Sequence, residues 1–215
     1  MTDFTRGRTF VKICGITSID DARMVAEAGA DAIGLIFAES TRQLTLEQAA
    51  LISRAVRGSI VRVGVFRHHA TDFVVRAVDE TGVDVAQIHG DLDGELVDAL
   101  RRRGVGIIKA LSVDDDEFCD FDERDVDAVL LDGPAPGSGE THAWPDLTVR
   151  GFARHVIAAG GLTPLNVTAA LEATGAWGVD ASSGVESAPG RKDPPRVRDF
   201  VSNARAFFER GASRG

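Results

Sequence analysis

The sequence predicts an α/β protein built as one compact (β/α)₈ barrel. Eight short apolar runs alternate with segments that carry helix signals. The runs are mostly apolar throughout, which is typical of parallel strands covered on both faces. Eight such units favour a closed barrel of the TIM type over an open sheet. The 215 residues allow each unit about 27 residues, a short but sufficient length.

The expected strands are the apolar runs themselves, several of which are rich in β-branched residues. They are Phe10–Cys14, Asp31–Phe37, Ile60–Phe66, Asp84–His89, Val105–Leu111, Val126–Asp132, His155–Ala159 and Ala176–Ala181.

Helix signals stand between several of these runs. Ser18 is placed to cap a helix that Gly29 would end, and Thr45 is placed to cap the next. Thr163-Pro164 predicts another helix start, because proline suits the first helical position. Residues Pro195–Glu209 carry apolar side chains at helical spacing and predict the last helix.

The segment after the sixth run gives the weakest signal. It is rich in glycine and proline, and only Asp146–Gly151 resembles a short helix. No linker divides the chain, so residues 1–215 are expected to form one domain with short polar tails at about 1–8 and 211–215.

Composition excludes several classes of protein. The net charge of −9 disfavours nucleic acid and anionic membrane surfaces, which attract basic patches. No apolar run has the length of a membrane span, and the N-terminus lacks the apolar core of a secretory signal. Two cysteines, Cys14 and Cys119, are too few for a disulfide framework. These features predict a cytoplasmic protein.

Other catalytic patterns are missing. A doubly wound sheet that binds a dinucleotide would need Gly-x-Gly-x-x-Gly after the first strand, where Cys14 is followed by Gly-Ile-Thr. The sequence has no P-loop, no Gly-x-Ser-x-Gly and no metal-ligand spacing, so no metal site is expected. The adjacent His68 and His69 are interpreted as loop surface.

Barrels of this type place their active sites at the C-terminal ends of the strands. Gly160 and Gly161 follow the seventh run, and Ser182, Ser183 and Gly184 follow the eighth. Backbone N–H groups at glycine turns and at a helix start can bind an anion, so these two loops predict a phosphate site. Two ordinary glycine turns that bind no ligand would have the same residues.

Two titratable residues also end apolar runs. Cys14 ends the first run beside Lys12, although a free cysteine can also simply fill buried space. Asp132 ends the sixth run. A partly desolvated carboxyl there would have a raised pKa and could donate a proton near neutral pH, although Asp-Gly is also a common turn pair.

Motifs along the whole chain resemble phosphoribosylanthranilate isomerases. The matching stretches are Val11–Thr17, Gly29–Gly34, Val63–Phe66, Gln87–Gly90, Leu130–Gly133, Gly137–Gly139 with Thr141 and Trp144, Gly160–Val167, Val179–Glu186 and Pro189–Asp193.

The resemblance implies an Amadori rearrangement in tryptophan biosynthesis that uses no metal and no organic cofactor. N-(5-phosphoribosyl)anthranilate, an aminoaldose, becomes 1-(2-carboxyphenylamino)-1-deoxyribulose 5-phosphate, an aminoketose. It further implies that Asp132 is the general acid, that Cys14 is the general base and that Arg42 binds the anthranilate carboxylate. The glycine and serine loops would hold the phosphate, and His89 and Asp180 match positions near the pocket. The small-molecule substrate is the only partner implied, for a monomer or a homodimer.

Three positions depart from the family pattern. Pro136 replaces a common glycine, His142 replaces an aromatic residue, and Thr41 stands where lysine or proline is usual. These departures concern loop closure and substrate fit, not Cys14 or Asp132.

Two rival functions are considered. The related histidine-pathway sugar isomerases, or a bifunctional version, use an aspartate where Cys14 stands and bind two phosphates, whereas one phosphate motif is present here. A phosphate-ligand-binding barrel without catalysis would have no use for an acid–base pair such as Asp132 and Cys14.

Overall fold

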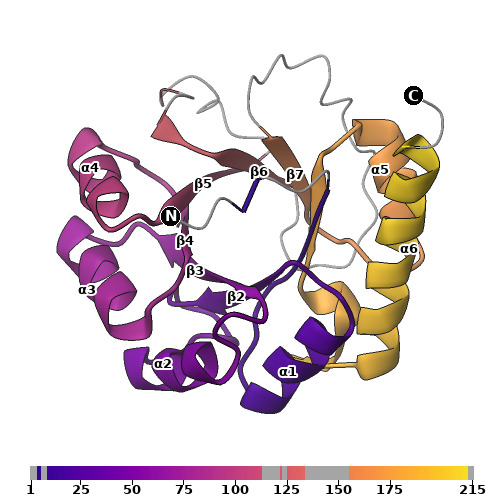
Figure 1. Cartoon of the computed structure of the whole chain (residues 1–215), viewed down its shortest axis with the longest axis horizontal. Helices are drawn as coiled ribbons and strands as arrows, with labels where there is room; N and C mark the ends of the chain where they lie inside the picture. Colours follow the sequence, from indigo (N-terminus) through magenta and orange to yellow (C-terminus); the bar gives the residue numbers. More distant parts are fainter. Residues whose placement is uncertain (1–3, 6–8, 113–121, 123–124, 134–154, 213–215) are drawn as a thin grey trace.

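The computed structural model describes residues 4–5, 9–112, 122, 125–133 and 155–212 (Figure 1). The strands of the barrel are β1 (Phe10–Ile13), β2 (Ala32–Ile36), β3 (Val61–Arg67), β4 (Val85–His89), β5 (Gly106–Ser112), β6 (Ala128–Asp132), β7 (His155–Ala159) and β8 (Gly178–Ala181). The helices are α1 (Ile19–Glu27), α2 (Leu46–Ala55), α3 (Thr71–Thr81), α4 (Gly94–Arg102), α5 (Val167–Thr174) and α6 (Pro194–Ala212).

The eight parallel strands close into a barrel in sequence order, with β1 pairing to β8. This confirms the predicted architecture, and every strand end lies within two residues of the predicted run. In Figure 1 the helices lie outside the barrel, from α4 and α3 on the left through α2 and α1 below to α6 and α5 on the right. Several elements of the sequence analysis lie outside the described residues: Cys119, Pro136, His142 and the possible helix at Asp146–Gly151.

Two of the predicted caps are present. The Ser18 hydroxyl accepts from the Asp21 N–H at 3.1 Å at the start of α1. Thr45 forms a reciprocal capping box with Gln48 at the start of α2, which satisfies two backbone donors. None of the described helices is both long and apolar enough to cross a membrane.

The predicted helix start at Thr163-Pro164 is wrong, since α5 begins at Val167. The Asn166 carboxamide oxygen accepts from the Thr163 N–H at 2.7 Å, and its amide donates to the Gly161 carbonyl at 3.0 Å. This side chain folds residues 163–166 into a turn ahead of the helix, because asparagine readily competes for nearby backbone groups. The glycine loop is thereby tied to the start of α5.

The chain after β8 contains elements that the sequence did not predict. A 3₁₀ turn, η4 (Ser183–Val185), leads into a small antiparallel hairpin of β9 (Glu186–Ala188) and β10 (Arg191–Lys192). At the other end of the chain, Phe4 lies within the expected polar tail and yet is buried against Phe10, with ring centroids 5.6 Å apart. Helix α6 continues to Ala212.

The core has two parts, one between strands and helices and one inside the barrel. Side chains of a strand alternate between these two sides. Phe10 and Cys14 of the first βα unit therefore face inward, while Val11 and Ile13 face the helices. The same alternation places a polar residue inside the barrel when it is an even number of positions from an inward-facing apolar residue of its strand.

An aspartate pattern repeats at the N-terminal end of the barrel. Asp31, Asp84 and Asp127 each stand just before an even-numbered strand, and each carboxylate accepts a backbone N–H from the preceding strand at 2.7–2.9 Å. Each also pairs with an arginine at 2.6–2.7 Å. These hydrogen bonds link the strands in pairs at the N-terminal end of the barrel, far from the C-terminal ends of the strands.

The tightest of these contacts gives a stability prediction. Arg62 donates from Nε and Nη2 to Asp84 at 2.8 and 2.6 Å, and both side chains are largely buried. Asp84→Ala leaves the guanidinium uncompensated and should lower the free energy of unfolding by about 3 kcal/mol.

Urea denaturation measures this loss. The control is Asp79→Ala, which removes a bidentate partner of Arg103 from an exposed site and should cost much less. Equal losses in the two variants would contradict the role given to Asp84.

Candidate active site

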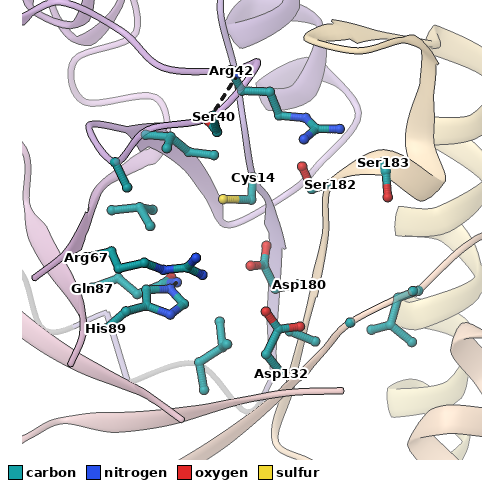
Figure 2. Close-up of a pocket in the computed structure, with 18 of the residues that line it drawn as sticks. Cys14, Ser40, Arg42, Arg67, Gln87, His89, Asp132, Asp180, Ser182 and Ser183 are labelled. Atoms are coloured by element: carbon teal, nitrogen blue, oxygen red, sulfur yellow. Dashed lines mark hydrogen bonds between the residues drawn. The ribbon is translucent and has the colours of Figure 1, made fainter. Parts of the chain in front are cut away.

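A pocket of about 270 Å³ lies where the C-terminal ends of the strands meet. Figure 2 shows several of its side chains converging from different strands. Of the residues predicted from the sequence, the pocket is lined by Cys14, Arg42, His89, Asp132, Gly160, Gly161, Asp180, Ser182 and Ser183. A pocket of this size suits a small molecule.

Gly184 is the predicted site residue that does not line the pocket. A Cβ on Gly184 would collide with the carbonyl of Leu162, so the glycine allows the loop after β8 to approach the loop after β7. Its role in the described structure is this close packing, which brings the two loops together beside the pocket.

Cys14 follows β1 directly, and its N–H donates to the Ala181 carbonyl at 2.8 Å. Gly34 makes room for the thiol, since a Cβ there would lie 2.5 Å from Sγ. Burial raises the pKa of the Cys14 thiol above its usual value, and the nearby Lys12 and Lys192 oppose this only in part. The resting form at neutral pH is therefore the thiol.

Beneath Cys14, Lys12 and Asp180 form a buried ion pair. Lys12 Nζ lies 2.6 Å from Asp180 Oδ2, and the lysine side chain has no exposed surface. Burial alone would lower the pKa of the Lys12 ammonium, but Asp180 and Cys14 together outweigh it and raise that pKa. The other oxygen, Asp180 Oδ1, is buried and has no hydrogen-bond partner among the described residues.

Asp132 is the last residue of β6 and has the electrostatics of a proton donor. Burial raises the pKa of its carboxyl to about 6, and the charge on Asp180 adds to this, while Lys12 and Arg67 act in the opposite direction. Gly160 leaves space beside this carboxyl, because a Cβ there would lie 2.8 Å from Asp132 Oδ1. Part of the Asp132 population is consequently protonated near neutral pH.

His89 cannot serve as a cationic acid in this setting. Burial lowers the pKa of its imidazole to about 3, helped by Arg67, Lys12 and Lys109. The ring is thus neutral, and its Nε2 lies 3.0 Å from the Gln87 amide nitrogen. Figure 2 shows Arg67 beside this pair on the wall of the pocket.

The loops after β7 and β8 form the side of the pocket suited to an anion. Gly160 and Gly161 both adopt positive φ, at 85° and 64°, which favours glycine. The hydroxyl of Ser182 is buried without a hydrogen-bond partner among the described residues, and Ser183 begins the 3₁₀ turn. A ligand oxygen would supply the missing partner.

Seven further polar residues lie at or beside the pocket without a role predicted from the sequence: Lys12, Glu39, Ser40, Arg67, Gln87, Glu186 and Lys192. A period of two could have found Lys12 and Gln87, which lie two residues before Cys14 and His89 and on the same side of the chain. Arg67 lies two residues after Val65, and both residues line the pocket. The positions of Glu186 and Lys192 depend on the unpredicted hairpin. Among the described residues, no three His, Cys, Asp or Glu side chains form a metal-binding group.

The predicted surface position of His68 and His69 holds for His68, which is exposed. His69 is half-buried, with its ring stacked 4.7 Å from that of Phe73.

Comparison with known proteins gives a consistent result. A family model for N-(5'phosphoribosyl)anthranilate (PRA) isomerase matches residues 11–203. The N-(5'-phosphoribosyl)anthranilate isomerase of Rubrobacter xylanophilus is 45% identical over 204 residues, which cover 91% of this chain and 98% of that protein.

Solved structures agree in both fold and sequence. A crystal structure of phosphoribosyl anthranilate isomerase with reduced 1-(o-carboxyphenylamino)-1-deoxyribulose 5-phosphate is 32% identical, with a TM-score of 0.77, and the match covers 92% of this chain and 99% of that one. Monomers of the dimeric phosphoribosylanthranilate isomerase from Thermotoga maritima are 31% identical, with a TM-score of 0.76 and coverage of 92% and 98%.

The buried thiol gives a prediction that needs no substrate. Because the pKa of Cys14 is raised, its alkylation by iodoacetamide should still accelerate above pH 9, where a small reference thiol with a pKa of about 8.5 has levelled off. Peptide mass spectrometry would follow Cys14 separately from Cys119. A rate that levels off at or below the pH of the reference thiol would contradict the raised pKa.

Proposed function

This chain belongs to the N-(5'-phosphoribosyl)anthranilate isomerase family, and we propose from that premise how its pocket performs the reaction. The enzyme converts N-(5-phosphoribosyl)anthranilate to 1-(2-carboxyphenylamino)-1-deoxyribulose 5-phosphate, an aldose–ketose isomerisation of tryptophan biosynthesis. The observation that carries the mechanism is a carboxyl with a pKa of about 6, Asp132, in one pocket with the thiol of Cys14.

Asp132 acts first, as the general acid. It donates its proton to the ribose ring oxygen while the bond between that oxygen and C1 breaks. The lone pair of the anthranilate nitrogen forms the C1=N double bond, which gives an open-chain Schiff base. The raised pKa suits this role, because an acid transfers protons well when its pKa is near the working pH.

Cys14 then acts as the general base. As thiolate it removes the C2 proton, and the electron pair moves through C1 to the nitrogen, which yields an enolamine. The thiol returns a proton to C1, the C2 hydroxyl gives its proton to Asp132, and the ketone forms. Both groups end in their starting states. C2 is oxidised and C1 is reduced within the same molecule, so the reaction needs no redox partner.

Two groups of residues hold the charged ends of the substrate. Arg42 lines the pocket near Cys14 and would bind the anthranilate carboxylate through its planar guanidinium. At the other end, Gly160, Gly161, Ser182 and Ser183 would hold the phosphate through N–H and hydroxyl donors. Gly184 supports this loop by packing and does not line the pocket.

Between these ends, buried acceptors remain for the sugar hydroxyls. Asp180 Oδ1 and Gln87 Oε1 have no hydrogen-bond partner among the described residues. Ribose hydroxyls are donors, and a buried acceptor without a partner is costly, so a bound open-chain sugar would satisfy both. Neutral His89, next to Gln87, completes this wall.

We further propose that the protein works in the cytoplasm as a monomer or a homodimer. The reaction needs the Cys14 thiol in reduced form, which a reducing compartment maintains. The phosphorylated substrate carries charges that keep it on one side of a membrane. A similar structure is described as a dimeric protein.

Removal of either proton-transfer group should abolish turnover. Cys14→Ala and Asp132→Asn should each lower kcat about 10³-fold, because general acid–base groups contribute about 10²–10⁴-fold. The loss of phosphoribosylanthranilate fluorescence measures turnover. Affinity for the product should stay within about tenfold, since the anion-binding groups remain. An inactive but folded wild-type protein, or active variants, would contradict the proposal.

The two raised pKa values also predict the pH profile. Between these two pKa values the dominant form of the enzyme has Asp132 ionised and Cys14 protonated. The productive form has Asp132 protonated and Cys14 ionised, and so it holds the same number of protons. The productive fraction of the enzyme is therefore independent of pH between the two pKa values. Below pH 6 both groups are protonated, no base remains, and kcat/KM should fall tenfold per pH unit.

Steady-state kinetics from pH 5 to 9 measure this profile. Phosphate monoesters also titrate near pH 6, so the profile of the residual activity of Asp132→Asn is the control. Without Asp132, the residual activity should follow the Cys14 thiolate and rise about tenfold per pH unit over the whole range. A break near pH 6 that persists in this variant would assign that break to the substrate and overturn its assignment to Asp132.

A further inference from the structure

Arg42 is held at the rim of the pocket by a carboxylate that the catalytic steps do not use. Arg42 Nε donates to Glu186 Oε1 at 2.8 Å, and Nη2 donates to Oε2 at 2.7 Å. The Glu186 side chain is 4% exposed and that of Arg42 is 18% exposed. Two parallel hydrogen bonds fix the plane of a guanidinium as well as its position.

Lys192 supports the same carboxylate from the opposite strand of the hairpin. Its Nζ lies 2.8 Å from Glu186 Oε1 and 3.2 Å from the Ser182 carbonyl. The Lys192 N–H also donates to the Asp21 carboxylate at 3.1 Å, which ties the hairpin to α1. The three side chains Arg42, Glu186 and Lys192 together carry one net positive charge, so the cluster still attracts an anion.

Gly15 leaves the space that the Arg42 side chain occupies. A Cβ on Gly15 would collide with Arg42 Cδ and lie 3.0 Å from Ser182 Oγ. Gly15 has φ of 74°, a conformation that favours glycine, directly after Cys14. The arginine stem therefore lies over the backbone beside the thiol, next to the loop expected to hold the phosphate.

The contact with Glu186 occupies only one edge of the guanidinium. Within the part of the chain that the structure describes, no protein group accepts from Nη1 of Arg42. Arg42 comes from the partly exposed loop after β2, where a long side chain would otherwise sample many rotamers. Ordering that side chain before the ligand arrives lowers the entropic cost of binding.

We propose that Glu186 is a positioning residue for substrate recognition: it fixes the Nε–Nη2 edge of Arg42, with Lys192 as its counter-ion, so that Nη1 is presented to the anthranilate carboxylate. This inference rests on the proposed function. Burial alone would raise the pKa of Glu186, but the hydrogen bonds and positive charges of Arg42 and Lys192 outweigh it and lower that pKa, so the carboxylate stays ionised at working pH. The hairpin thus determines selectivity for a substrate carboxylate without touching the substrate.

The test compares ligands with and without the carboxylate in Glu186→Gln. For phosphoribosylanthranilate, KM should rise about tenfold while kcat stays within twofold. For N-(5-phosphoribosyl)aniline, which lacks the carboxylate, KM should not change. In an Arg42→Met background, Glu186→Gln should have no further effect, because the two residues act through one contact.

Binding measurements separate this inference from the proposed function. Calorimetry with reduced 1-(o-carboxyphenylamino)-1-deoxyribulose 5-phosphate needs no turnover, and Glu186→Gln should weaken its affinity about tenfold. Wild-type protein that neither turns over the substrate nor binds this compound would overturn both proposals. Normal wild-type activity with unchanged affinity in Glu186→Gln would overturn this inference alone.

Two more variants distinguish the positioning role of Glu186 from a purely structural effect. Asp79→Asn removes one carboxylate oxygen from a bidentate pair of the same geometry, at 2.8 and 3.0 Å from Arg103, outside the pocket, and should leave both KM values unchanged. Glu186→Asp keeps the charge and should recover part of the lost affinity, and it provides the measurement if Glu186→Gln does not fold. Equal rises in KM for both substrates, or a fall in kcat at constant KM, would show that Glu186 does not act through the carboxylate.

Discussion

The ion pair between Lys12 and Asp180 is the constraint around which the pocket is built. It joins β1 to β8, the strands at which the barrel closes, and Lys12 stands directly opposite Asp180 in the register. A lysine without exposed surface needs such a partner, because an unpaired buried charge is prohibitively costly. The next inward residues above this pair are Cys14 and Ser182, so the same contact lies below the proposed base and part of the proposed phosphate site.

This pair also determines how charge is distributed around the reacting centre. Asp180 raises the pKa of Asp132, while Lys12 opposes the rise in the pKa of Cys14 that burial causes. The chain as a whole has a net charge of −9, which would repel a dianionic substrate. Local cations, with Arg42 and Arg67 on the pocket wall and Lys192 behind Glu186, offset the carboxylates of Glu39, Asp132 and Asp180 where the substrate binds.

The sequence predicted the barrel and most residues of the candidate site. Strand positions could be predicted because the apolar runs alternate with turn residues and helix signals, and Cys14, His89 and Asp132 could be found because they end such runs. The start of α5 could not be predicted, since it depends on how the Asn166 side chain bonds to the backbone around it. Gly184 belongs to the expected motif but serves close packing between two loops.

By itself, the sequence determined the fold class, the end of the barrel where the candidate site was expected and the titratable residues at that end, while the family resemblance supplied the roles of Asp132 as acid and Cys14 as base. These depend on local patterns: hydrophobic runs, turn residues and the rule that parallel strands end together. Only the tertiary structure decided the protonation states and the supporting contacts. The pKa of Asp132 depends on burial and on Asp180, 48 residues away in the sequence, and the clamp on Arg42 is formed by Glu186, 144 residues away. Burial and electrostatic coupling depend on distances in space, which no local pattern in a single sequence contains.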